Sequence, residues 1–161
     1  LRAMSKTSAP ETYLKKASEL LHEAKANGIW VKVNILLFAG ETVETLKETR
    51  EWLDNHRTCI KGLSVGSVLG FGWPENSSAF THYLQKLGAS IRQDQSFTGV
   101  TRFDLSEEIT LEEAERYSLL LCREHMTPDD YYDLKSFSYF PRSYTREQFH
   151  IDRQSVRHLQ E

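Results

Sequence analysis

The chain has 161 residues, of which 39% are hydrophobic and 27% are charged, which is enough for one globular domain with a buried core. A formal net charge of −3, with acidic and basic residues interspersed, gives no electrostatic footprint for nucleic acid or for an anionic membrane. No segment approaches the roughly 18 consecutive apolar residues of a membrane-spanning helix, and the first residues lack a signal-peptide pattern. We therefore expect a cytoplasmic protein that binds neither nucleic acid nor membrane.

The cysteines and histidines predict no metal site within this chain. Cys59 and Cys122 are far apart and belong to no CxxC or Cys/His ligand spacing. The histidines show no mutual ligand spacing either. We expect the two thiols to be ordinary buried or half-buried groups.

The first predicted element is a helix from Ser8 to Asn27. Apolar residues recur there with helical spacing, at Leu14, Ala17, Leu20, Leu21 and Ala24. Ser8 and Glu11 predict a capping box around Pro10 at the start of the helix. Gly28 predicts the left-handed residue that closes it.

An apolar strand from Ile29 to Phe38 follows directly. Alternate residues form one face that we expect helices to cover, namely Ile29, Val31, Val33, Ile35 and Leu37. The other face mixes polar and apolar groups, at Trp30, Lys32, Asn34, Leu36 and Phe38. A Gly-Glu-Thr turn then leads into a helix that is capped by Thr42 and runs to about Asn55. This order is typical of a parallel βαβ unit.

A second strand is predicted from Gly62 to Gly70. Leu63, Val65, Ser67 and Leu69 share one face, and Ser64, Gly66, Val68 and Gly70 share an unusually small one. Glycines leave no side chain to pack, so we expect a ligand or another backbone to come close to this second face.

The remaining chain is predicted to be mostly helical and irregular. We expect a loop from 70 to 77 containing Trp73 and Pro74, a short helix from Ala79 to Leu87 closed by Gly88, and an extended piece from Phe97 to Asp104. Thr110 and Glu113 form a second capping box, and the helix that they open stops before Pro128. Beyond it, a moderately amphipathic stretch runs from Arg146 to Leu159, and the tail aromatics are expected to pack this segment against the rest of the molecule.

The first strand and its turn carry a resemblance to a known family. The segment from Leu1 to Thr7, the helix after it, Gly28-Ile29 and the sequence Asn-Ile-Leu-Leu-Phe-Ala-Gly-Glu-Thr at 34–42 resemble the second half of a radical S-adenosylmethionine enzyme. In that family a G-x-I-x-G-x-x-E motif ends the fifth barrel strand, and many members show a PGET-like turn there.

The motif falls on Asn34, Leu36, Phe38 and Glu41. Glu41 matches, Leu36 stands in for the isoleucine that packs against adenine, and Asn34 and Phe38 replace the two glycines. The strand from Gly62 is similar to the sixth barrel strand, which by resemblance places Val68, Leu69 and Gly70 beside the cofactor. These seven residues are the candidate cofactor contacts, and no catalytic residue is assigned.

The resemblance implies an α/β fold in which residues 1–88 form a partial (β/α) TIM-type barrel fragment with parallel strands. Residues 89–161 would form a mainly helical and irregular extension. It also implies S-adenosylmethionine and a [4Fe-4S] cluster as cofactors of the full-length protein. The CxxxCxxC motif that holds the cluster is absent from this chain, and two distant cysteines do not replace its three thiolates. We therefore expect either a degenerate relative or, favoured by a beginning at Leu1, the carboxyl-terminal part of an enzyme whose missing amino-terminal half completes the barrel.

Two other functions remain open at this point. The chain could be a non-catalytic α/β module that binds a partner or small ligand, or part of another TIM-barrel enzyme with Glu41 as a general base. Glu41 could equally offset the positive end of the helix that follows it, and Lys32 and Asn34 could be polar groups within a core. The substrate, a small molecule or a peptide, is not indicated by the sequence.

Overall fold

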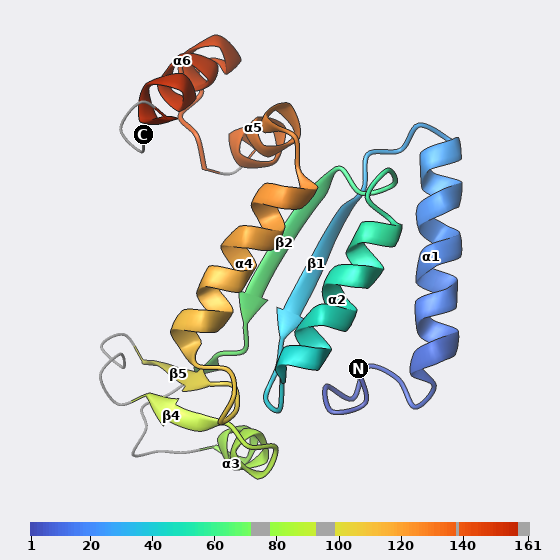
Figure 1. The fold of residues 1–161 in the computed structure, drawn as a ribbon, viewed down its shortest axis with the longest axis vertical. Helices are drawn as coiled ribbons and strands as arrows, with labels where there is room; N and C mark the ends of the chain where they lie inside the picture. Colours follow the sequence, from blue (N-terminus) through green and yellow to red (C-terminus); the bar gives the residue numbers. More distant parts are fainter. Residues whose placement is uncertain (72–77, 93–98, 138, 158–161) are drawn as a thin grey trace.

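The computed structural model describes residues 1–71, 78–92, 99–137 and 139–157 (Figure 1). Trp73 and Pro74 of the predicted loop, and the first residues of the predicted extended piece at 97–104, lie outside these ranges. The elements in chain order are α1 (Pro10–Ala26), β1 (Lys32–Leu37), α2 (Val43–Asn55), β2 (Gly62–Ser67), β3 (Gly70–Phe71), α3 (Ala79–Lys86), β4 (Ser90–Arg92), β5 (Val100–Asp104), α4 (Leu111–His125), α5 (Pro128–Ser136) and α6 (Arg146–Arg157). None of the helices within these ranges is long and apolar enough to cross a membrane.

The centre of the fold is a two-stranded parallel sheet. β1 pairs with β2 from Lys32 opposite Gly62 to Leu37 opposite Ser67, and α2 forms the crossover between them. The predicted parallel βαβ arrangement is thereby confirmed, and the described chain is a mixed α/β protein. In Figure 1, α4 lies alongside β2 and α2 alongside β1, with α1 beyond α2.

The helices bury one face of this sheet. Leu53 of α2, Leu63 of β2 and Leu121 of α4 are fully buried in one hydrophobic cluster. Val33 and Ile35, at alternate positions of β1, pack against the same cluster. Burial on this face and exposure of the intervening residues is the alternation that the sequence predicts.

A second, antiparallel sheet lies beyond the carboxyl ends of the parallel strands. Its order is β3-β5-β4, and Phe103 of β5 is fully buried in a second hydrophobic cluster with Leu37 and Leu84. Sequence analysis predicted β5 but neither β3 nor β4. The predicted strand from Gly62 to Gly70 is wrong as one element, because β2 ends at Ser67 and Gly70 begins β3.

Both hydrophobic clusters draw residues from before and after residue 88, the expected boundary between a barrel part and an extension. Leu63 and Leu121 share one cluster, and Leu37 and Phe103 share the other. The part of the extension that contains β5 and α4 is therefore packed against the parallel strands.

Most predicted helix ends are confirmed. The Thr42 and Thr110 side chains accept hydrogen bonds from backbone N–H groups in the first turns of α2 and α4. Gly28 and Gly88 have positive φ angles of 68° and 101°, which only glycine adopts readily. The predicted Ser8 cap is wrong, because Ala9 occupies the N-cap position of α1 without a side-chain hydrogen bond.

The tail forms two helices that pack on each other. As predicted, α4 ends before Pro128, at His125. Pro128 is the first residue of α5, where its missing N–H costs nothing, and Thr127 caps that helix. The Phe149 ring of α6 lies 5.6 Å from that of Tyr132 and 6.1 Å from that of Phe140. These aromatic residues therefore join α5 to α6, rather than to the strands.

Candidate functional site

The face of the parallel sheet opposite α1, α2 and α4 is the candidate site. Asn34 and Leu36 of β1 point to this face and pair in register with Ser64 and Gly66 of β2. Asn34 and Gly66 are exposed, and the Leu36 residue keeps 41% of its surface exposed. Two of the seven predicted cofactor contacts thus share one accessible surface, which we call the open face.

Phe38 and Val68 are not on the accessible part of this surface. They are 6% and 4% exposed and belong to the cluster around Leu37. The Phe38 ring lies 6.4 Å from that of Phe80 in α3, and the Val68 N–H donates to the Leu37 carbonyl at 2.9 Å. Their side chains contribute to the core in this structure.

Leu69 and Gly70 lie in the turn out of the parallel sheet. Leu69 is 40% exposed, whereas Gly70 is buried and begins β3. A Cβ atom at Gly70 would lie 3.2 Å from the Phe103 ring, so the absence of a side chain there allows close packing with β5. Of these two residues, Leu69 is the one whose side chain reaches solvent.

The Glu41 carboxylate is bonded within its own turn. It accepts hydrogen bonds from the Phe38 N–H at 3.3 Å and from the Thr45 hydroxyl. The Thr45 oxygen also accepts from the Thr42 N–H at 2.9 Å, which ties Glu41 to the cap of α2. This arrangement places Glu41 at the positive end of a helix, where a carboxylate is stabilised.

The glycines of β2 have three different environments, counting Gly62, Gly66 and the nearby Gly70. A Cβ atom at Gly62 would lie 2.4 Å from the Trp30 indole, so this glycine lets the indole rest on the strand. A Cβ atom at Gly66 would meet nothing within 4 Å. Of the two glycines on the predicted small face, Gly70 is thus explained by the Phe103 ring, whereas Gly66 faces open space.

The two outer edges of the parallel sheet differ. On β2, the Leu63 N–H donates to the Met126 sulfur at 3.3 Å, and the Leu63 carbonyl accepts from the Cys122 thiol at 3.5 Å. On β1, the Val31 and Leu37 carbonyls bond to β2, so alternation turns the backbone groups of Lys32, Asn34 and Leu36 away from β2. Those outward groups have no hydrogen-bond partner within the described ranges.

The polar groups of the core form no metal site among the described residues. Cys59 is buried with its sulfur 3.5 Å from the His22 Nδ1 atom, and burial raises the pKa of the half-buried Cys122 thiol. Both thiols are therefore as expected from the sequence. Sequence reasoning did not single out the Ser67 hydroxyl, which is buried without a hydrogen-bond partner in the described structure.

The Asp54 carboxylate links the end of α2 to α4. Asp54 lies 2.8 Å from Arg57 Nη2 and 3.1 Å from Nε2 of the buried His125. The hydrogen bond from Arg57 is the largest cause that lowers the pKa of the Asp54 carboxyl, and the charge of His125 adds to it. This bracing helps to hold α4 in place over the outer edge of β2.

Comparison with known proteins identifies no relative of this chain. No family model, curated protein or solved structure matches the chain.

Proposed function

We propose that this chain is the carboxyl-terminal part of a radical S-adenosylmethionine enzyme, in which β1 and β2 are strands of a partial (β/α) barrel. The open face would line the barrel interior and contribute contacts to the adenine of S-adenosylmethionine and to a substrate. The family resemblance at 34–42 motivates this proposal, and the difference between the two sheet edges is the observation that carries it.

The edge that is left unpaired is the outer edge of β1. In the described chain the outward backbone groups of Leu63 on β2 bond to the sulfur atoms of Cys122 in α4 and of Met126 just after it, whereas the outward groups of β1 from Lys32 to Leu36 are unpaired. A sheet of two strands is marginal by itself, and an unpaired edge is where a further strand adds. In a barrel the strands that precede β1 in the chain would occupy that edge, which is the half that the resemblance implies is missing.

The residues of the open face fit a planar ring. Leu36 is accessible and Gly66, its partner in register, leaves its side of the strand unobstructed. An apolar side chain beside a bare backbone segment suits an adenine ring, which is flat and has hydrogen-bonding edges. In the bound state the cofactor and cluster would supply a 5′-deoxyadenosyl radical, while this chain would orient the adenine and exclude water.

The cluster does not fit this chain. Three thiolates on one loop are needed, and Cys59 and Cys122 come from different elements and are engaged with His22 and the Leu63 carbonyl. The cluster ligands would therefore belong to the other half, and we expect the 161 residues to be inactive alone.

A non-catalytic α/β binding module is the second candidate, and two observations favour it. The Glu41 carboxylate is occupied in its own turn, and Phe38 and Val68 are buried. A module of this kind would use the same open face without a radical cofactor.

The proposal is tested by titrating the ¹⁵N-labelled chain with S-adenosylmethionine. We expect saturable shifts at the amides of Asn34, Leu36 and Gly66, with a Kd of about 1 mM because only half of the site is present. Leu36→Asp should abolish these shifts, and Leu119→Asp, at a leucine that is 64% exposed on α4, should not. Shifts confined to other elements would contradict the proposal.

The proposed radical chemistry is tested by reading the coding sequence upstream of Leu1. A CxxxCxxC motif within about one half-barrel upstream, and 5′-deoxyadenosine formed by the complete protein but not by this chain, are the expected results. A start codon just upstream would favour the binding module. Reductive cleavage of S-adenosylmethionine by the isolated chain would contradict the proposal that the cluster ligands lie in the other half of the enzyme.

A further inference from the structure

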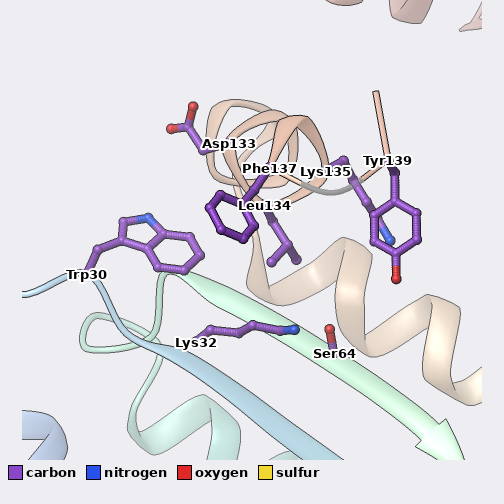
Figure 2. Close-up of a pocket in the computed structure, with 8 residues that line it drawn as sticks. All are labelled: Trp30, Lys32, Ser64, Asp133, Leu134, Lys135, Phe137 and Tyr139. Carbon is purple, nitrogen blue, oxygen red and sulfur yellow. The ribbon is translucent and has the colours of Figure 1, made fainter. Parts of the chain in front are cut away.

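A cavity lies between α5 and the amino-terminal half of the parallel sheet. It has a volume of about 640 Å³, within the range of small-ligand sites. Its lining comprises Trp30, Lys32, Ser64, Asp133, Leu134, Lys135, Phe137 and Tyr139 (Figure 2). Lys32 is four residues, about 13 Å, from Leu36 along β1. The cavity therefore lies at the amino-terminal end of the open face, where its lining residue Ser64 stands opposite Asn34, and Leu36 lies toward the other end.

Large rings that are poorly buried surround the cavity. Phe137 and Tyr139 are 92% and 74% exposed, and Trp30 is 44% exposed. Trp30 is nevertheless held in place, because its indole rests against Gly62, where a Cβ atom would overlap it. Three rings gathered around one opening form the kind of wall that binds a flat apolar group.

The charges inside the cavity favour an anion. Lys32 extends toward the Ser64 hydroxyl across the floor (Figure 2), and neither group has a hydrogen-bond or ion-pair partner in the described part of the chain. Asp133, the acid of the lining, points away from the interior (Figure 2) and pairs with Arg146.

A second cation borders the opening. The Lys135 ammonium lies 4.6 Å from the centre of the Tyr139 ring and 5.6 Å from that of Tyr131. This contact keeps its positive charge beside the aromatic wall.

We propose that this cavity binds a small organic anion built on a planar ring. Lys32 and Ser64 would hold the anionic group, and Trp30, Phe137 and Tyr139 would enclose the ring. An ammonium and a hydroxyl together suit a phosphate or carboxylate oxygen. The proposal uses only residues of this chain, and it does not depend on the barrel or on S-adenosylmethionine.

The test is a titration of the ¹⁵N-labelled 161-residue chain with phenyl phosphate, monitored by amide shifts. Saturable shifts are expected at Lys32, Ser64 and Lys135, with a Kd of about 1 mM or below. Inorganic phosphate and benzyl alcohol, which carry only one of the two recognised features, should bind at least about tenfold more weakly.

Two variants separate charge from ring binding. Lys32→Met should weaken the binding of phenyl phosphate at least about tenfold and leave the binding of benzyl alcohol unchanged. Lys16→Met, at an exposed lysine of α1, should change neither. Phe137→Ala should weaken the binding of phenyl phosphate and of benzyl alcohol about two- to tenfold. Because the Phe137 side chain is exposed, this change should leave the fold intact.

Three results would overturn the proposal. They are unchanged phenyl phosphate binding by Lys32→Met, equal binding of inorganic and phenyl phosphate, and shifts that map to elements other than β1, β2 and α5. Binding of benzylammonium as tight as that of phenyl phosphate would show that the cavity adsorbs rings without selecting an anion, and would also contradict the proposal.

Discussion

The outer edges of β1 and β2 are opposites within one small sheet. On β2, the side chains of Met126, which follows α4, and of Cys122 in α4 bond to the outward N–H and carbonyl of Leu63. On β1, the outward groups from Lys32 to Leu36 meet no partner in the ranges that the structure describes. The comparison teaches that side chains occupy the outer edge of β2 at Leu63, whereas the described outer edge of β1 is unpaired from Lys32 to Leu36, which makes β1 the more accessible edge for a further strand.

The largest effect should come from loosening the helix that covers β2. Leu121 of α4 is fully buried against Leu63 and Leu53. Leu121→Ala should lower the free energy of unfolding by about 2–5 kcal/mol, since it removes buried apolar surface and leaves a cavity. Urea unfolding measures this, with Leu119→Ala as an exposed control expected to stay within about 0.5 kcal/mol. Similar losses in both variants would show that α4 is not anchored through this face.

A pair of proline variants probes the open edge directly. Ile35→Pro removes an N–H that bonds to β2, whereas Asn34→Pro removes one that points away from it. Relative to the alanine variants at the same positions, the Ile35 change should cost about 1–3 kcal/mol more, because it leaves a β2 carbonyl unpaired. Equal costs in urea unfolding would mean that the edge assignment for β1 is wrong.

The smallest expected effect concerns the ion pair that braces α4. The pKa of Asp54 is lower in the folded chain than its ordinary 3.8, so its ionised form stabilises the fold above that value. This contribution is lost as the pH falls from 3.8 through the lower folded pKa. Because the Asp54 side chain is 45% exposed, it amounts to at most about 1 kcal/mol. Asp54→Asn should therefore reduce stability at neutral pH, with the difference from the unmodified chain vanishing in acid; a difference independent of pH would contradict this.

Local features of the fold could be predicted from the sequence. Thr42 and Thr110 cap helices, and Gly28 closes one, because these roles depend on residues a few positions away. The parallel strand pair follows from hydrophobic alternation and from the helix between the strands. Pro128 shows the limit of such signals, since the same residue can end one helix or begin the next.

Distant contacts account for what was missed. Gly66 and Gly70 suggested a ligand, but the Phe103 ring fills the space beside Gly70, and Gly66 of these two faces open space. The strands β3 and β4 have two and three residues and owe their existence to pairing with β5, which no local period reveals. At the candidate site, the motif located Asn34 and Leu36 on an accessible face, and it carried no sign that Phe38 would pack on Phe80.

The unpaired edge of β1 also affects how this chain behaves in concentrated solution. A bare strand edge is a template for pairing between molecules, and charged residues along it discourage such pairing. The Lys32 side chain extends toward Ser64 of β2 and away from this edge, and the exposed Leu36 leaves the far end of the edge apolar. Intermolecular aggregation should therefore begin at the Leu36 end, and a lysine introduced there would act as a gatekeeper that keeps the chain monomeric.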